Sequence, residues 1–187
     1  MHETSLEGTI LDYLTGQEIR NSTFEDLRQA LARLMTEECG FPKESLKPRT
    51  QIRVIVDGQT AEQTIDIAAF KPDGKPLMAV LFCFGKPGTF LRQSVAAARL
   101  GPDGPFPLTL VTDTKEFFLT RTADEKEILE GSSEFPSWRT VLAMAAEAPA
   151  WPADEIRKQR EARILLAYAS LSGPCCGDSC SLDEDRP

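Results

Sequence analysis

Apolar and polar residues alternate along this chain with two different periods, and the two periods separate helices from strands. Between Ser22 and Gly40 apolar residues recur every three or four positions, which predicts an amphipathic helix capped by Ser22. Residues 51–56 alternate between polar and apolar, residues 64–70 form a partner strand, and residues 77–84 are apolar throughout. The third of these strands is therefore expected to be buried on both faces.

The second half of the chain repeats the change from helix to strand. Residues 90–100 are rich in alanine and are predicted to form a helix, residues 108–112 a central strand and residues 116–122 a more exposed strand. Two further helices are predicted over residues 137–147 and 153–171. A helix between the third and fourth strands suits a right-handed crossover that joins parallel strands. The pattern therefore predicts an α/β fold, with a mixed sheet flanked by helices.

The predicted elements divide the chain into four parts. Residues 1–20 are an N-terminal segment with a short helix near residues 10–14, and residues 21–148 form the main domain. Residues 149–172 hold a C-terminal helix that follows a proline-flanked linker. Residues 173–187 are an acidic tail that contains cysteines, and we predict that this tail is flexible because it has little apolar surface to bury.

The amino-acid composition excludes several kinds of functional site. The net charge of −8 weighs against a protein that holds DNA alone by neutralising many phosphates, although a local basic groove or a partner can supply that contact. The single histidine is His2, so neither a Ser–His or Cys–His nucleophile pair nor a histidine-rich zinc site is expected. The glycine-rich loops that bind nucleotides are absent from the sequence, so no nucleotide cofactor is expected. Without a membrane-spanning apolar run or a secretory signal, the expected location is the cytoplasm.

The order of the elements and several local motifs resemble a known family. Helix, three strands, helix and strand is the αβββαβ core of the PD-(D/E)XK nuclease fold. Segments along residues 20–172 resemble, in order, the N-terminal domain of the R subunit (HsdR) of type I restriction enzymes. These segments are the helix entry at 23–28, the Gly-Phe-Pro turn within 38–43, the Asp strand at 63–70 with its turn at 73–76, the turn at 111–116, and the end segments 135–137 and 160–165.

The resemblance implies a metal-dependent endonuclease site, in which an Asp on one strand and a Glu-x-Lys on the next hold Mg²⁺ and orient the attacking water. Asp66 matches the Asp and is the candidate metal ligand. The Glu-x-Lys is not retained. If Phe82 takes the place of the Glu, both the acid and the lysine are missing; if Phe84 does, Lys86 matches the lysine and only the acid is missing. Mg²⁺ is therefore expected only if the site is active.

Two helix residues complete the catalytic candidates. Glu25 resembles the helix acid of the family, which can bind the metal through water, but it also suits a capping box with Ser22. Gln93 resembles the Gln of a Gln-x-x-x-Tyr helix motif, although Ala97 stands at the Tyr position.

Ordinary structural roles remain open for the same residues. Asp66 suits a strand-end carboxylate that accepts backbone hydrogen bonds, Lys86 a solvated lysine, and Gln93 a helix-surface amide. Arg28 and Arg92 suit either a path for phosphates or a solvated helix face.

Three cysteines, Cys175, Cys176 and Cys180, lie within six residues of the tail. A structural zinc or iron–sulfur site usually takes four ligands, commonly with a Cys-x₂-Cys pair, and this spacing does not provide one. Cys39 or Cys83 can add a fourth ligand only if the tail folds back, and both are predicted to be buried. Metal binding and a solvated, redox-exposed tail both remain open.

The sequence therefore predicts a stand-alone domain of the R-subunit N-terminal kind, with a degenerate nuclease site and little or no DNA cleavage. One alternative is an active metal-dependent endonuclease whose site is rebuilt, with Glu25 or another carboxylate beside Asp66 and Lys86. The other is a non-catalytic module that contacts a protein or a metal through its acidic surface or its cysteines. The resemblance implies DNA and other restriction–modification subunits as partners, while no ATP-driven motor is encoded in these 187 residues.

Overall fold

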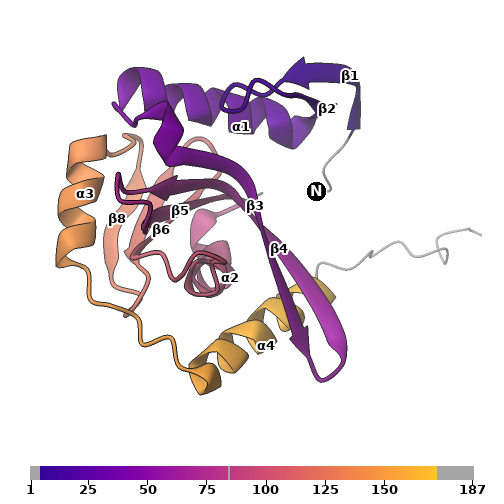
Figure 1. The fold of residues 1–187 in the computed structure, drawn as a ribbon, viewed down its shortest axis with the longest axis vertical. Coiled ribbons are helices and arrows are strands. Elements are labelled where there is room, and N and C mark those ends of the chain that lie inside the picture. Colours follow the sequence, from indigo (N-terminus) through magenta and orange to yellow (C-terminus); the bar gives the residue numbers. More distant parts are fainter. Residues whose placement is uncertain (1–4, 84, 172–187) are drawn as a thin grey trace, which may run out of the picture.

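A six-stranded mixed sheet forms the centre of the molecule, which confirms the predicted α/β fold (Figure 1). The computed structural model describes residues 5–83 and 85–171. Within these residues the strand order follows the sequence, from β3 to β8, and β5 and β6 are the parallel neighbours. The six strands are β3 (Leu46–Val56), β4 (Gln59–Phe70), β5 (Pro76–Phe82), β6 (Leu108–Thr112), β7 (Phe117–Arg121) and β8 (Glu127–Ser132).

The first helix begins where the sequence predicts. Helix α1 (Thr23–Arg33) is capped by Ser22, whose side-chain oxygen accepts a hydrogen bond from the backbone N–H of Glu25 at 3.2 Å. A π-helical turn, Leu34–Glu38, continues the helix to Gly40, whose φ of 74° is the left-handed conformation that glycine adopts easily. The predicted helix from Ser22 to Gly40 is therefore present, with a change of helical geometry in its last part.

The predicted hairpin and crossover are both present. Asp57 and Gly58 have φ values of 50° and 80°, as a two-residue turn between antiparallel strands requires, and they join β3 to β4. Helix α2 (Pro87–Arg99) connects β5 to the parallel strand β6. The crossover places the end of β5, where a second carboxylate is expected in a nuclease, beside β4 and beneath α1.

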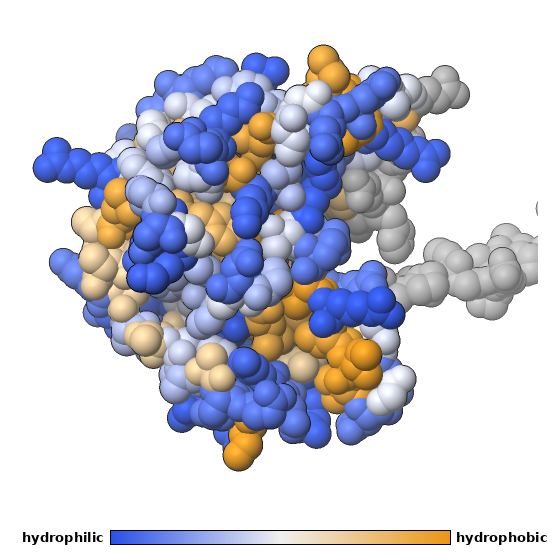
Figure 2. Space-filling view, in the orientation of Figure 1, coloured by the Kyte–Doolittle hydropathy of each residue, from blue (hydrophilic) through white to orange (hydrophobic). Residues whose placement is uncertain are grey.

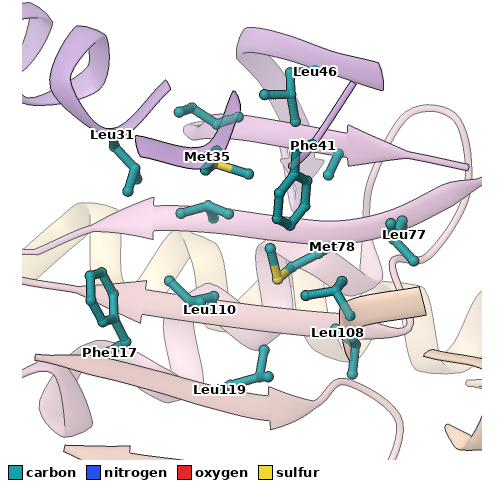
Figure 3. Close-up of a cluster of buried hydrophobic side chains, with 14 of the residues drawn as sticks. Leu31, Met35, Phe41, Leu46, Leu77, Met78, Leu108, Leu110, Phe117 and Leu119 are labelled. Carbon is teal, nitrogen blue, oxygen red and sulfur yellow. The ribbon is translucent and has the colours of Figure 1, made fainter. Parts of the chain in front are cut away.

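Helices cover the sheet on both faces, and each face has its own apolar core. One core lies between the sheet and α1 together with α3 (Trp138–Glu147), and the other between the sheet and α2 together with α4 (Glu155–Leu171). Figure 3 shows the first core, where Leu31 and Met35 approach the sheet from above. Phe41 meets the ring of Trp138 edge to face at 5.2 Å, which fixes α3 against this core.

The surface is mainly polar on the side that Figure 2 shows, with one larger hydrophobic patch in the region where Figure 1 shows α4 and the β3–β4 hairpin. The most exposed large apolar side chains are Leu11, Ile55 and Ile156. In the part of the chain that the structure describes, no helix is both long and apolar enough to cross a membrane.

The helix expected near residues 10–14 is wrong. Ser5–Leu11 forms strand β1 and pairs with β2 (Glu18–Ser22) in a separate two-stranded sheet. The Asp12 carboxylate accepts hydrogen bonds from the backbone N–H groups of Leu14 and Thr15, at 2.9 and 2.8 Å. An aspartate that bonds its own following backbone in this way favours a turn over a helix.

The exposure expected for residues 116–122 is also wrong. Phe117, Leu119 and Thr120 of β7 are buried because the short strand β8 pairs along the outer side of β7. Strand β8 was not predicted from the sequence. Gly131 interrupts it with a φ of 63°, and its pairing with β7 is irregular.

Candidate functional site

Asp66 lies on β4 with its side chain only 13% exposed, and both of its carboxylate oxygens are engaged. Oδ1 accepts a hydrogen bond from Nη2 of Arg28 at 2.7 Å, and Oδ2 accepts one from the backbone N–H of Phe82 at 2.8 Å. The backbone bond was an open alternative for Asp66, and it is present. The ion pair with Arg28 was not expected from the sequence.

Arg28 joins Asp66 to Glu25. The guanidinium of this α1 residue donates to the Glu25 carboxylate through Nη1 and to Asp66 through Nη2, and Arg28 is only 5% exposed. Glu25 also accepts two hydrogen bonds from Arg49, at 3.0 and 2.9 Å, and one from Gln29 at 3.3 Å. The structure therefore brings the two predicted acids, Glu25 and Asp66, to one shared cation.

Arg49 extends this network to the N-terminal hairpin. It lies on β3 between Pro48, which pairs with Ile67, and Thr50, which pairs with Ile65, and its φ of 52° is unusual for a residue other than glycine. Nη2 of Arg49 contacts Oδ2 of Asp12 at 2.7 Å. Residues that lie far apart in the sequence thus meet under α1.

Asp12 and Arg49 are the two members of the network that sequence reasoning missed. Asp12 is 1% exposed and lies in the turn between β1 and β2. A polar residue before Thr15 and Gly16 signals a turn, but nothing in the sequence indicates its ion pair with Arg49. Burial alone would raise the pKa of Asp12, but the Thr15 backbone N–H and the Arg49 guanidinium outweigh it, so the pKa is lowered.

The pKa of Asp66 is shifted in the opposite direction, upward. Burial is the largest influence and raises the pKa of Asp66, and the nearby charge of Glu25 raises it further. Arg28 and the Phe82 backbone N–H act against this, but the net direction is upward.

The network of Asp12, Glu25, Arg28, Arg49 and Asp66 holds three carboxylates and two guanidinium groups, so it has one negative charge in excess when all five are ionised.

Phe82, one of the two residues that could replace the second acid, lies beside Asp66. The register of β4 and β5 pairs Ile67 with Val80, and the Phe82 backbone N–H reaches the Asp66 carboxylate. The Phe82 ring packs at the core beneath α1, where it lines an apolar cavity of about 150 Å³ with Leu27 and other residues. Phe84, the residue of the other alignment, lies outside the described residues, so both alignments stay predictions.

The other two candidates are not joined to this network. Lys86 is exposed at the start of α2, and within the described ranges no ion pair connects it to Asp66 or Glu25. Gln93 donates a hydrogen bond from Nε2 to Oε1 of Gln63 on β4 at 2.5 Å. Among the described residues, Glu25 and Asp66 share a cation, and neither Lys86 nor Gln93 makes a hydrogen bond or an ion pair with them.

Both roles considered for Arg28 are wrong. Arg28 is buried in the network, so it neither lines a phosphate path nor lies on a solvated face. Arg92 is half-buried and pairs with buried Glu161 at 2.7 Å and with exposed Glu125 at 3.8 Å. A role of Arg92 along a phosphate path stays a prediction.

The residues at this site do not fit Mg²⁺. Mg²⁺ takes near-octahedral oxygen ligands, and all four carboxylate oxygens of Glu25 and Asp66 already accept hydrogen bonds from Arg28, Arg49, Gln29 or Phe82. Phe82 adds no ligand atom. Among residues 5–83 and 85–171, no group of three or more His, Cys, Asp or Glu side chains is placed to hold a metal ion.

The cysteines give no support to a metal site in the described part of the chain. Cys83 is buried, and burial raises its pKa to about 12, which keeps the thiol protonated near neutral pH. Cys39 is only half-buried, so the prediction that both are buried holds for Cys83 alone. Cys175, Cys176 and Cys180 lie outside the described residues.

The chain is similar to a known protein family and to a solved structure. The family described as type I restriction enzyme R protein N terminus matches residues 24–136, more than half of the chain. Among solved structures, the chain is similar to the type IIG restriction endonuclease BpuSI, with 12% sequence identity and a TM-score of 0.35. That match covers 75% of this chain and 16% of the enzyme. A comparison with curated protein sequences gives no significant match. The chain belongs to the family of type I restriction enzyme R protein N-terminal domains.

Proposed function

We propose that this chain is an R-subunit N-terminal-like domain whose nuclease site is degenerate and which cleaves DNA weakly or not at all. The observation that supports the proposal most strongly is the pairing of Asp66 with Arg28 and with the backbone of Phe82, in the place where a nuclease needs a metal and a second acid. DNA and restriction–modification subunits are its proposed partners, as ligands that it binds without cutting.

The chemistry of metal-dependent cleavage explains why these contacts matter. The metal lowers the pKa of the attacking water and offsets the charge that develops on the phosphate, and carboxylates must hold the metal in place. Phe82 has no oxygen in its side chain, and Asp66 has no carboxylate oxygen free of a donor. Lys86, the candidate for contact with the phosphate, is exposed and is not joined to Asp66. The second acid is therefore missing, and the Asp66 carboxylate is held by donors instead of a metal.

Nicking of supercoiled plasmid tests the proposal. Wild-type protein and the Asp66→Ala variant are titrated with Mg²⁺ and then with Mn²⁺, and an active nuclease serves as the positive control. We expect both proteins to leave the plasmid intact at every metal concentration. Cleavage by the wild type that disappears in Asp66→Ala would overturn the proposal.

An active enzyme with a rebuilt site is the second candidate, and one observation favours it. Glu25 and Asp66 share a guanidinium, so two carboxylates do lie close together. For a metal to use them, Arg28 must leave. The plasmid assay separates the two candidates, because a rebuilt site loses cleavage in Glu25→Gln as well as in Asp66→Ala.

Binding to DNA is a separate part of the proposal. The net charge of −8 opposes binding to a polyanion, so we expect weak association that falls steeply with salt. Fluorescence anisotropy with a labelled duplex at 50 mM and 200 mM salt measures it. Tight binding that does not change with salt would contradict this expectation.

A further inference from the structure

Two buried carboxylates meet at one buried guanidinium. Glu25 on α1 and Asp66 on β4 are 7% and 13% exposed in their side chains, and Arg28 between them is 6% exposed. Each terminal nitrogen of Arg28 serves one of the two acids. Two anions held this close and this far from water need a positive charge beside them, because burial removes the water that would otherwise screen their repulsion.

We propose that Arg28 is the resident cation of this site, that it takes the place of a divalent metal between Glu25 and Asp66, and that it keeps metal ions out. This inference rests on the proposed function, since both concern the same carboxylates. A guanidinium keeps its charge at every pH at which the protein folds, so a metal cannot gain entry through loss of a proton from Arg28.

The ion pairs of Arg28 and Arg49 also connect the N-terminal hairpin to the sheet. Arg28 and Arg49 both donate to Glu25, and Arg49 also contacts Asp12 in the turn between β1 and β2. Tyr13, next to Asp12, donates its backbone N–H to the side chain of Gln29 on α1 at 2.6 Å. Loss of the Arg28 charge is therefore expected to weaken the contacts that join β1, β2, α1, β3 and β4.

Replacement of Arg28 by methionine tests the proposal, because methionine keeps much of the apolar volume and removes the charge. We expect Arg28→Met to lower the unfolding temperature by about 10 °C, since it leaves two carboxylates without their shared cation. Mn²⁺ at millimolar concentration should then raise the unfolding temperature of Arg28→Met by several degrees and leave the wild type unchanged. The measurement is differential scanning calorimetry with and without Mn²⁺.

Arg33→Met is the matched control on the same helix. Arg33 is exposed and its ion-pair partner is Glu37, at 3.7 Å, so its loss should change the unfolding temperature little and give no response to Mn²⁺. A response to Mn²⁺ of equal size in Arg33→Met would mean that the ion binds elsewhere, and it would overturn the proposal.

A double variant decides the case in which Arg28→Met does not fold. Arg28→Met combined with Asp66→Asn removes the cation and one of the two anions, so it should fold more stably than Arg28→Met and should not respond to Mn²⁺. Failure of the double variant to fold better than the single one would contradict the role of Arg28 as a counter-ion.

Wild-type protein distinguishes this inference from the proposed function. Binding of one Mn²⁺ per chain that is lost in Asp66→Asn, without any cleavage of DNA, would overturn the inference and leave the proposed function standing. Cleavage of plasmid that depends on Asp66 would overturn the proposed function. Absence of both supports the two together.

Discussion

Two clusters of arginine and carboxylate, each with a buried centre, lie on opposite faces of the sheet, and their charges differ. On the α2 and α4 side, Arg92 and Arg99 face Glu125 and Glu161, two positive charges against two negative ones. On the α1 side, two arginines face three carboxylates. Buried ion pairs alone therefore do not mark a functional site in this protein, since one of the two clusters is neutral and joins helices.

The donors of the two central arginines are also used differently. Arg99 donates to the backbone carbonyl oxygens of Thr122 and Ala123, at 2.9 and 3.1 Å, and to Glu161 at 2.8 Å, so it ties α2 to α4 and to the end of β7. Arg28 gives both terminal nitrogens to carboxylates. The cluster around Arg28 has one negative charge in excess. This excess is expected of the proposed site, in which a singly charged guanidinium takes the place of a divalent metal.

The largest expected effect is that of Arg99→Met. It leaves Glu161 with Arg92 as its remaining partner and removes the hydrogen bonds of Arg99 to two carbonyl oxygens, and breaking a buried pair on one side costs about 3–5 kcal/mol. Urea denaturation measures this loss in the free energy of unfolding. Mn²⁺ should not restore the stability of Arg99→Met, in contrast to Arg28→Met, and restoration of equal size in both variants would remove the difference between the clusters.

A smaller effect is expected when one anion is removed from each cluster. Glu161→Gln unbalances a neutral cluster and should cost about 2–3 kcal/mol, whereas Asp66→Asn removes a surplus charge and should cost about 1 kcal/mol, mainly through the hydrogen bonds to Arg28 and Phe82. Urea denaturation of the two variants at neutral pH gives the comparison. An equal or larger loss in Asp66→Asn would show that the Asp66 charge is fully compensated.

The smallest effect concerns pH. The pKa of Asp66 is raised in the folded protein, chiefly by burial, so the folded state holds the proton more strongly than the unfolded chain. The contribution of Asp66 to the free energy of unfolding therefore falls as pH rises from 3.8, the ordinary value, through the raised pKa. The stability of wild type relative to Asp66→Asn should decrease over that range in urea denaturation at several pH values. A relative stability that increases with pH would show a lowered pKa instead.

Asp12 should behave in the opposite way within the same network. Its pKa is lowered, so the stability that it contributes is present above the ordinary value of 3.8 and is lost as pH falls through the lowered pKa. Asp12 and Asp66 therefore change the free energy of unfolding in opposite directions as pH rises, although Arg49, Glu25 and Arg28 connect them.

Strong periodicities made most of the fold predictable from the sequence. The alternation before Asp57-Gly58 and the apolar run from residue 77 fixed the antiparallel strands, and the alanine-rich helix after them fixed the crossover. Strands β1, β2 and β8 were not predicted, and the pairing of β1 with β2 and of β8 with β7 is irregular. The local pattern of apolar and polar residues does not predict such strands, since it is their pairing with neighbouring strands that stabilises them.

Two carboxylates of the candidate site, Asp66 and Glu25, were predicted from the sequence, and Asp12 was not. The resemblance implied both, since Asp66 matches the Asp of the family's metal-binding strand and Glu25 its helix acid. The ion pair of Arg28 with Asp66 joins residues that lie 38 positions apart, and the pair of Arg49 with Asp12 depends on an unusual backbone conformation. Ionic contacts of this kind arise from packing and leave no periodic signal.

Binding of Mn²⁺ to the wild-type protein, measured by isothermal titration calorimetry, tests the central claim most directly. The claim is that Arg28 supplies the cation that Glu25 and Asp66 require. We predict no saturable binding by the wild type and binding of one ion by Arg28→Met, with no binding when Asp66→Asn is added. One Mn²⁺ bound per wild-type chain, and lost in Asp66→Asn, would contradict the account.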